Sequence, residues 1–241
     1  MSQFRQIAIS EFRKFARDSI LMLVLLAPIL ILVIVRLGIP LISEVLYTSF
    51  TFQLDPYYPL IFIFFCAIFP LLFGMMAGFS LLDEQDEKVL QFIAITPLSR
   101  GGYLRTKFAV PTLATIPVLL IFAWLCGLFD GRYLRFLPMA ILFALETPMM
   151  GMFLSGFANN KVEGLALGKA AGVFFAVPGA GYFLPSPWCY LTGLSPVFWP
   201  MNAYWSTSAA GYWTSLGIGI IMHAIVFWLL YRKFTRKVLQ F

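Results

Sequence analysis

Six long apolar stretches dominate this chain of 241 residues, and each approaches the length that a helix needs to cross a bilayer. A membrane span takes about 20 mostly apolar residues, because the hydrocarbon core offers exposed backbone groups no hydrogen-bond partner. Charged residues make up only 12% of the chain, about half their share in a soluble domain, so too few remain for a water-facing coat. The expected spans cover residues 19–39, 57–82, 108–128, 134–157, 164–178 and 212–231.

These spans predict an all-α integral membrane protein in which residues 1–241 form a single transmembrane domain. Residues 40–56 are expected to form an outer loop between the first two spans. Residues 3–17 carry aromatic and basic side chains at helical spacing, which predicts an amphipathic interfacial helix; a frayed basic tail is the alternative. Residues 182–211 are rich in proline and aromatic residues and carry no charge, which favours a re-entrant or interfacial hairpin before the sixth span.

The distribution of Lys and Arg predicts how the spans are oriented. With six spans, both chain ends and residues 83–107 lie on one side, together with 14 of the 17 basic residues. The other three, Arg36, Arg132 and Arg135, fall on the opposite side. Because short cytoplasmic loops carry an excess of Lys and Arg, both termini are expected in the cytoplasm.

Several function classes are disfavoured by the sequence. The net charge of +6 would suggest nucleic-acid binding in a soluble protein, but membrane topology accounts for these cations here. There is one histidine, no H-E-x-x-H zinc motif and no G-x-x-x-x-G-K-[ST] phosphate-binding loop. Cys66, Cys126 and Cys189 lack metal-site spacing and are expected to be apolar filler, with a Cys126–Cys189 bridge as the alternative. We therefore expect no catalytic residues, metal site or cofactor on this chain.

Two sets of glycines have the spacing of close helix contacts in membranes. Gly74 and Gly78 form a G-x-x-x-G pair in the second span, and Gly164, Gly168 and Gly172 recur every four residues in the fifth. Small residues at this spacing clear one helix face of side chains, so that another helix can approach closely. The longer ridge in the fifth span predicts tight packing more firmly than the common pair in the second.

Two polar side chains fall near the middle of predicted spans. Glu146 lies in the fourth span and His223 in the sixth. A carboxylate in hydrocarbon is costly, so Glu146 must face protein or water, or be protonated. Both residues are candidates for the translocation pathway. The alternative is a structural hydrogen bond from Glu146 to a hydroxyl, to His223 or to a backbone carbonyl near Pro148.

The long polar segment at residues 83–107 interrupts the apolar pattern between the second and third spans. Pro97 disfavours helical geometry at the residue before it, and Gly101-Gly102 permits a sharp return into the third span. The segment is expected to be a capped cytoplasmic helix, either a plain connector or a docking surface. The acidic residues are expected to begin it, with Asp83 as the N-cap and Glu84, Asp86 and Glu87 in the first turn.

This segment also carries a resemblance to a known family. Residues 81–100 read Leu-Leu-Asp-Glu-x-Asp-Glu-x-x-Leu-Gln-x-x-x-x-Thr-Pro-Leu-Ser-Arg, and Tyr103-Leu104 and Lys107 follow. The pattern resembles the cytoplasmic coupling segment of type-2 ATP-binding-cassette (ABC) exporter permeases. One departure is Lys88-Val89, which stands where that family often has Gly-Thr. The six-span layout and the hairpin before the sixth span are also similar.

The resemblance implies a bacterial inner-membrane permease that exports a hydrophobic or amphipathic drug, peptide or lipid-like cargo. The permease would pair with a second copy or a paralogue among membrane lipids, and two separate ABC ATPase subunits would bind ATP and magnesium. The Gly74 and Gly78 face and the outer hairpin would line the dimer axis. The residues implied to couple to the ATPase are Asp83, Glu84, Asp86, Glu87, Thr96, Pro97, Leu98, Ser99 and Arg100.

Two other functions stay open on the sequence alone. A secondary carrier or channel could use Glu146 as an ion-coupling residue, although the two halves of the chain show no convincing inverted repeat. A membrane assembly or sensor subunit that transports nothing is the third possibility.

Overall fold

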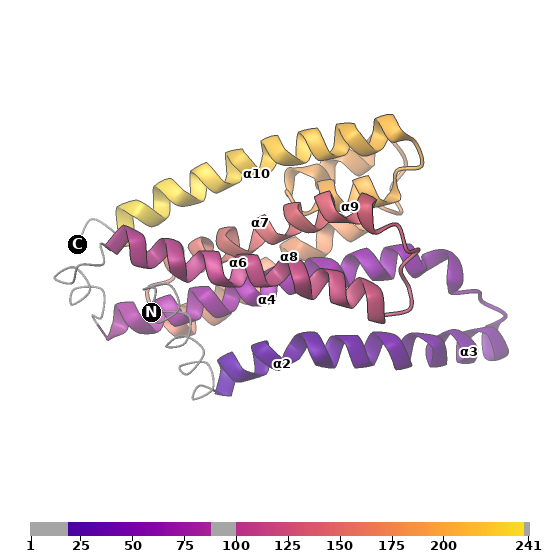
Figure 1. Cartoon of the computed structure of the whole chain (residues 1–241), viewed down its shortest axis with the longest axis horizontal. Helices are drawn as coiled ribbons and strands as arrows, with labels where there is room; N and C mark the ends of the chain where they lie inside the picture. Colours follow the sequence, from indigo (N-terminus) through magenta and orange to yellow (C-terminus); the bar gives the residue numbers. More distant parts are fainter. Residues whose placement is uncertain (1–18, 88–99, 239–241) are drawn as a thin grey trace.

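The computed structural model describes residues 19–87 and 100–238, which form a bundle of long helices lying roughly along one axis (Figure 1). Six helical stretches in these ranges are long and apolar enough to cross a membrane, which confirms the predicted six-span all-α fold. The predicted interfacial helix at residues 3–17 falls outside the described residues and stays a prediction. The candidate spans are Met22–Phe50, Asp55–Asp86, Gly102–Leu125, Tyr133–Phe157, Lys161–Ala180 and Ala209–Val238.

The first span is longer than predicted. α2 (Ser19–Val33) continues through a π-helical turn at Ile34–Gly38 into α3 (Ile39–Phe50). The predicted outer loop at residues 40–56 is therefore wrong as far as Phe50, because the minimum length for a span sets no upper limit on the helix. Thr51 ends it in a left-handed conformation (φ 52°), and its N–H donates to the Tyr47 carbonyl at 3.0 Å.

The third span also begins earlier than predicted. α6 covers Arg100–Leu125, so Gly101 and Gly102 are helical and do not form the expected sharp return. Glycine weakens a helix by roughly 1 kcal/mol per residue, which tertiary contacts readily offset. Tyr103 and Lys107 on the next two turns make such contacts with α4 (Tyr58–Asp86).

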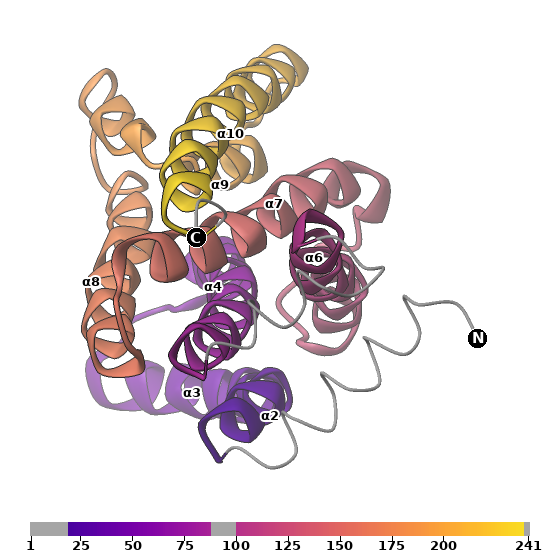
Figure 2. The same ribbon diagram turned by 90° about the vertical axis from the view of Figure 1, so that its left-hand side faces the viewer.

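Two helices, α4 and α7 (Tyr133–Phe157), occupy the centre of the bundle (Figure 2). A Cβ atom on Gly74 would lie 2.5 Å from Met150 Cβ, and one on Gly78 would lie 2.9 Å from Leu154 Cβ. The pair therefore packs against α7 of the same chain. The expectation that this face lines a dimer axis is wrong, because α7 already covers it.

The fifth span, α8 (Lys161–Ala180), also packs against α4. Gly164 faces Leu82 and Gly168 faces Met75, with ideal Cβ positions 2.7 and 2.8 Å from those side chains. Gly172 has nothing within 4 Å of its ideal Cβ position. Tight packing thus holds for the first two glycines of the predicted ridge, and the third lies in open space.

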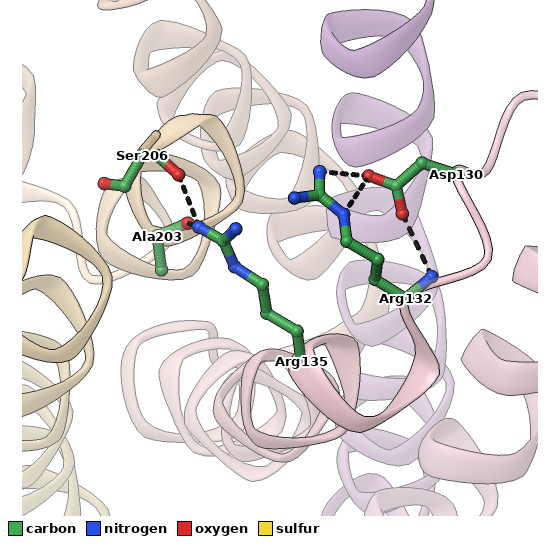
Figure 3. Close-up of polar contacts among 5 residues, drawn as sticks. All are labelled: Asp130, Arg132, Arg135, Ala203 and Ser206. Atoms are coloured by element: carbon green, nitrogen blue, oxygen red, sulfur yellow. Dashed lines mark hydrogen bonds and ion pairs between the residues drawn. The ribbon is translucent and has the colours of Figure 1, made fainter. Parts of the chain in front are cut away.

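The segment between α8 and α10 (Ala209–Val238) folds back into the bundle as predicted. It contains a 3-10 helix at Trp188–Leu194 and the short helix α9 (Phe198–Trp205), most of whose side chains are buried. Arg135 of α7 holds the end of α9, because its guanidinium donates to the carbonyls of Ala203 and Ser206 (Figure 3). A cation at a helix C-terminus is favourable to the helix dipole. Residues 182–211 thus form a hairpin whose α9 part is mostly buried, whereas residues 183–188 are exposed.

Candidate functional site

The acidic residues at the start of the polar segment end a helix and do not begin one. Asp83, Glu84 and Asp86 lie in the last turn of α4, and the N–H of Glu87 donates to the Asp83 carbonyl at 2.9 Å. The predicted N-cap at Asp83 is therefore wrong. Negative charge is unfavourable at a helix C-terminus, so these carboxylates depend on partners from elsewhere in the fold.

Basic residues from two other helices supply those partners. Lys107 of α6 forms an ion pair with Glu84, and the Tyr103 hydroxyl donates to Glu84 Oε1 at 2.8 Å. The Lys161 ammonium at the start of α8 donates to Asp83 Oδ2 at 3.1 Å. Glu84 and Lys107 are only 4% and 3% exposed. We call these five residues the α4 anchor, because they join the end of α4 to α6 and α8.

The remaining predicted coupling residues lie partly inside and partly outside the described ranges. Asp86 and Glu87 are exposed, and neither forms an ion pair with another residue in the described ranges. Arg100 is the first residue of α6. Thr96, Pro97, Leu98 and Ser99 belong to residues 88–99, outside the described part of the chain, so the coupling helix itself stays a prediction.

The two polar residues predicted at membrane depth lie together. Glu146 Oε1 on α7 is 3.0 Å from His223 Nε2 on α10, and each side chain is 3% exposed. His223 Nδ1 is 2.7 Å from the Gly219 carbonyl, one turn earlier on α10. The contact between Glu146 and His223 is one of the structural pairings that the sequence left open, and it joins the fourth span to the sixth.

The geometry limits how protons are arranged in this pair. A carbonyl oxygen can only accept a hydrogen bond, so Nδ1 of His223 must carry a proton. A second proton between Nε2 and Glu146 Oε1, held either by an imidazolium or by a carboxylic acid, would make their 3.0 Å contact attractive. In both arrangements the pair has no net charge, which is the least costly state in a low-dielectric interior.

Glu146 also lines a cavity of about 360 Å³ between α7, α8, α10 and the hairpin. Three phenylalanines, Phe153, Phe174 and Phe175, contribute to its walls. Ser195 lines the hairpin side of this cavity, and its buried hydroxyl has no hydrogen-bond partner among the described residues. A pocket that is mostly apolar with a few polar groups is the usual form of a small-molecule site.

The opposite end of the bundle carries a separate polar group, in the turn between α6 and α7 (Figure 3). Arg132 donates from its backbone and its side chain to Asp130, with Nε 2.7 Å from Oδ2. Partial burial alone would raise the pKa of Asp130, but the hydrogen bonds and charge of Arg132 outweigh it and lower that pKa. Arg36 of the first span lies over Gly127 in the same turn, where φ is +78° and a side chain would find no room.

Some of these site residues have no signal in the sequence. Ser195 is one serine in a hairpin without charges, and Lys161 looks like an ordinary loop cation. Arg135 was assigned to topology alone, although its place in a charge-poor outer region could have indicated a partner. The predicted alternative of a Cys126–Cys189 bridge is wrong, because both cysteines are free.

Comparisons with known proteins agree with this architecture. Residues 11–231 match the family described as Fluoroquinolones export permease protein Rv2686c-like. Two relatives, the Fluoroquinolones export permease proteins MT2760 and Rv2686c, come from the CDC 1551 and H37Rv strains of Mycobacterium tuberculosis. Each is 28% identical over 232 residues, which cover 95% of this chain and 92% of the relative. No solved structure matches the chain.

Proposed function

We propose, from the premise that this chain belongs to the family of Rv2686c-like fluoroquinolone export permeases, that it is the membrane subunit of an ATP-driven exporter. The observation that carries the proposal is the match over residues 11–231, nearly the whole chain. In this proposal a separate ABC ATPase hydrolyses ATP, and the permease provides the path through the membrane. Two ATPase subunits and two permeases, identical or related, make up the complex.

The cargo in this proposal is a hydrophobic or amphipathic molecule. The M. tuberculosis relatives are named for fluoroquinolones, which are drugs of that kind. A mostly apolar cavity that contains a single carboxylate is compatible with such a cargo. The alternative function is a secondary carrier in which Glu146 couples transport to an ion. The contact between Glu146 and His223 is the observation that supports this alternative.

The ATPase is proposed to bind where α4 and α6 meet residues 88–99. The end of α4, the start of α6 and the end of α10 lie at the same end of the bundle (Figure 1). Asp86 and Glu87 expose negative charge there, at a helix C-terminus where a basic partner surface would be favourable. The excess of Lys and Arg at this end supports a cytoplasmic location in the cell membrane.

The α4 anchor changes which residues should be tested for coupling. Glu84 is buried against Lys107, so replacing it would disturb the fold before it disturbed a partner. Asp86 and Glu87 are exposed and can be reversed in charge without that cost. Glu44 offers a matched control, because it is an exposed carboxylate on α3 at the opposite end of the bundle.

The test combines purification with transport. The wild-type chain, expressed with its neighbouring genes and extracted in mild detergent, should co-purify with an ABC ATPase detected by mass spectrometry. The double variant Asp86→Lys/Glu87→Lys should lose most of this ATPase and lose ATP-dependent export, while Glu44→Lys keeps both. Unchanged ATPase recovery and unchanged export in the double variant would contradict docking at this end of α4. Export that persists without any ATPase would favour the secondary carrier.

A further inference from the structure

We propose that the cavity between α7, α8, α10 and the hairpin is a binding site within one subunit for an aromatic molecule that carries an amine. Glu146 would receive the amine, Ser195 would hydrogen-bond to a second polar group, and the phenylalanines would contact the ring. This inference rests on the proposed function only in treating the bound molecule as cargo. Binding itself requires nothing but this chain.

The first observation is the unpartnered hydroxyl of Ser195. This residue is 3% exposed, its N–H donates to the Thr192 carbonyl at 3.1 Å, and its carbonyl accepts from Phe198 N–H at 3.1 Å. The backbone is thus satisfied, and only the side-chain oxygen lacks a partner within the described ranges. Buried hydroxyls are normally hydrogen-bonded, so an exception at a cavity wall points to a group that enters the cavity.

The second observation is the sign of the charge at the cavity. Glu146 is the one ionisable side chain on the cavity wall in the described part of the chain, and it contributes a carboxylate. A proton shared between Glu146 and His223 would keep the pair neutral. When an ammonium group binds and that proton leaves to water, the site again has no net charge. A carboxylate ligand would find no cation on this wall, so an amine is the fitting chemistry.

The third observation is the aromatic lining. Phe153, Phe174 and Phe175 come from α7 and α8 and share the cavity with Glu146. Aromatic faces attract ammonium groups as well as other rings. A lipid acyl chain would fill the same space but would satisfy neither Ser195 nor Glu146. The combination of polar and aromatic groups therefore favours an amphipathic amine over a purely apolar occupant.

The test measures binding to the purified chain in detergent, with empty micelles as the reference. The probe is dansylcadaverine, which joins a fluorescent naphthalene ring to a primary amine. Its N-acetylated form keeps the ring and loses the charge. The wild-type chain should bind the amine about tenfold more tightly than the acetylated form, as expected when a charged hydrogen bond is lost.

Variants of the chain test whether the preference for the amine over the acetylated probe arises in the cavity. Glu146→Gln should bring the two probes to within about twofold of each other, and Ser195→Ala should weaken both by several-fold. Ala171→Phe, which fills the cavity and leaves Glu146 in place, should abolish binding of both. Glu44→Gln is the control for removing a carboxylate and should behave as wild type. Each variant is first required to elute as a folded species in size-exclusion chromatography.

Two results would overturn the proposal. Equal binding of the two probes to the wild-type chain would mean an apolar occupant, such as lipid, and amine binding that survives Ala171→Phe would place the site elsewhere. This assay uses neither ATP nor a partner, so its result does not depend on whether the proposed exporter function is correct. Probe binding with no ATP-dependent export would refute the exporter, and export with no amine preference would refute this site.

Discussion

Two carboxylates, Glu84 and Glu146, are buried in the described part of this chain. Each contacts a basic side chain on another helix, but their surroundings differ. Glu84 is held by Lys107 and by the Tyr103 hydroxyl, in a cluster that also neutralises the neighbouring Asp83 through Lys161. Glu146 faces one base, His223, and borders a cavity. The first carboxylate is enclosed by partners, and the second retains an open side.

The difference indicates what each carboxylate can do. The Glu84–Lys107 pair is enclosed by protein on all sides, so it is a fixed link between α4 and α6. The Glu146–His223 pair borders a cavity, so a molecule that enters the cavity can contact it. Burial alone therefore does not distinguish the two carboxylates; the space beside Glu146 does.

The largest effect is expected from breaking the enclosed pair. Lys107→Met leaves Glu84 buried without its cation, and removing one partner of a buried pair costs roughly 3–5 kcal/mol. The free energy of unfolding, measured by denaturant titration in mixed micelles, should fall by that amount. The double variant Glu84→Gln/Lys107→Met should recover much of the loss, because it no longer buries a lone charge.

The open pair supplies the contrast for this experiment. Glu146→Gln keeps a group that can hydrogen-bond to His223, so the unfolding free energy should fall by only about 1 kcal/mol. Export should suffer more than stability. If Lys107→Met and Glu146→Gln destabilise the chain equally, the distinction between an enclosed and an open carboxylate is wrong.

Arg135 extends the comparison of the two buried ion pairs, because its guanidinium is hydrogen-bonded by backbone carbonyls and not by a carboxylate. It donates to the Ala203 and Ser206 carbonyls and lies over the Tyr212 ring, with its Cζ atom 4.9 Å from the ring centroid. Hydrogen bonds to charged groups contribute about 1.5–3 kcal/mol, so Arg135→Gln should loosen the hairpin by that much. Maleimide labelling of Cys189, which lies in the hairpin, should become faster.

Arg132→Gln is the control for the hairpin experiment. Its side chain is 57% exposed and is paired with Asp130, and in the described part of the chain it donates no hydrogen bond to α9, so Cys189 labelling should keep its wild-type rate. Equal acceleration in the two variants would mean that any loss of positive charge at this end, and not the contact with α9, loosens the hairpin.

The smallest effect is expected at the exposed ion pair. The folded-state pKa of Asp130 is lowered, so its contribution to stability is present above the unfolded-state pKa and is lost as the pH falls through the folded-state value. Asp130→Asn should cost about 0–1 kcal/mol at pH 7, as is typical of exposed pairs. Unfolding titrations at neutral and acidic pH would measure it. A loss that matched the Lys107→Met value would show that exposure does not separate these pairs.

The sequence predicts the spans well and their ends poorly, for a physical reason. The bilayer sets a minimum length for an apolar helix, and nothing in that rule stops α3 before Phe50 or α4 before Asp86. The acidic run was assigned to a helix start because carboxylates favour that position. What stabilises it at a helix end are Lys107 and Lys161, and no local pattern reveals that tertiary contact.

The candidate sites divide in the same way. The intramembrane positions of Glu146 and His223 follow from the sequence, because polar residues are conspicuous in apolar spans. Their contact with each other was one of several open pairings, and Ser195 was not predicted at all. Ser195 is singled out because its hydroxyl lacks a hydrogen-bond partner, and this can be recognised only when the surrounding structure is known.

The light packing of the first span has a consequence for how the protein is made. This span is the most apolar of the six, and α3 has no buried residue. When it leaves the ribosome its neighbour α4 has not been synthesised, so it must enter the membrane on its own hydrophobicity. α8 is the least apolar span, and its Gly164 and Gly168 lie against α4, which is inserted earlier. The order of the helices along the chain therefore places the self-sufficient segment first and the dependent one after its partner.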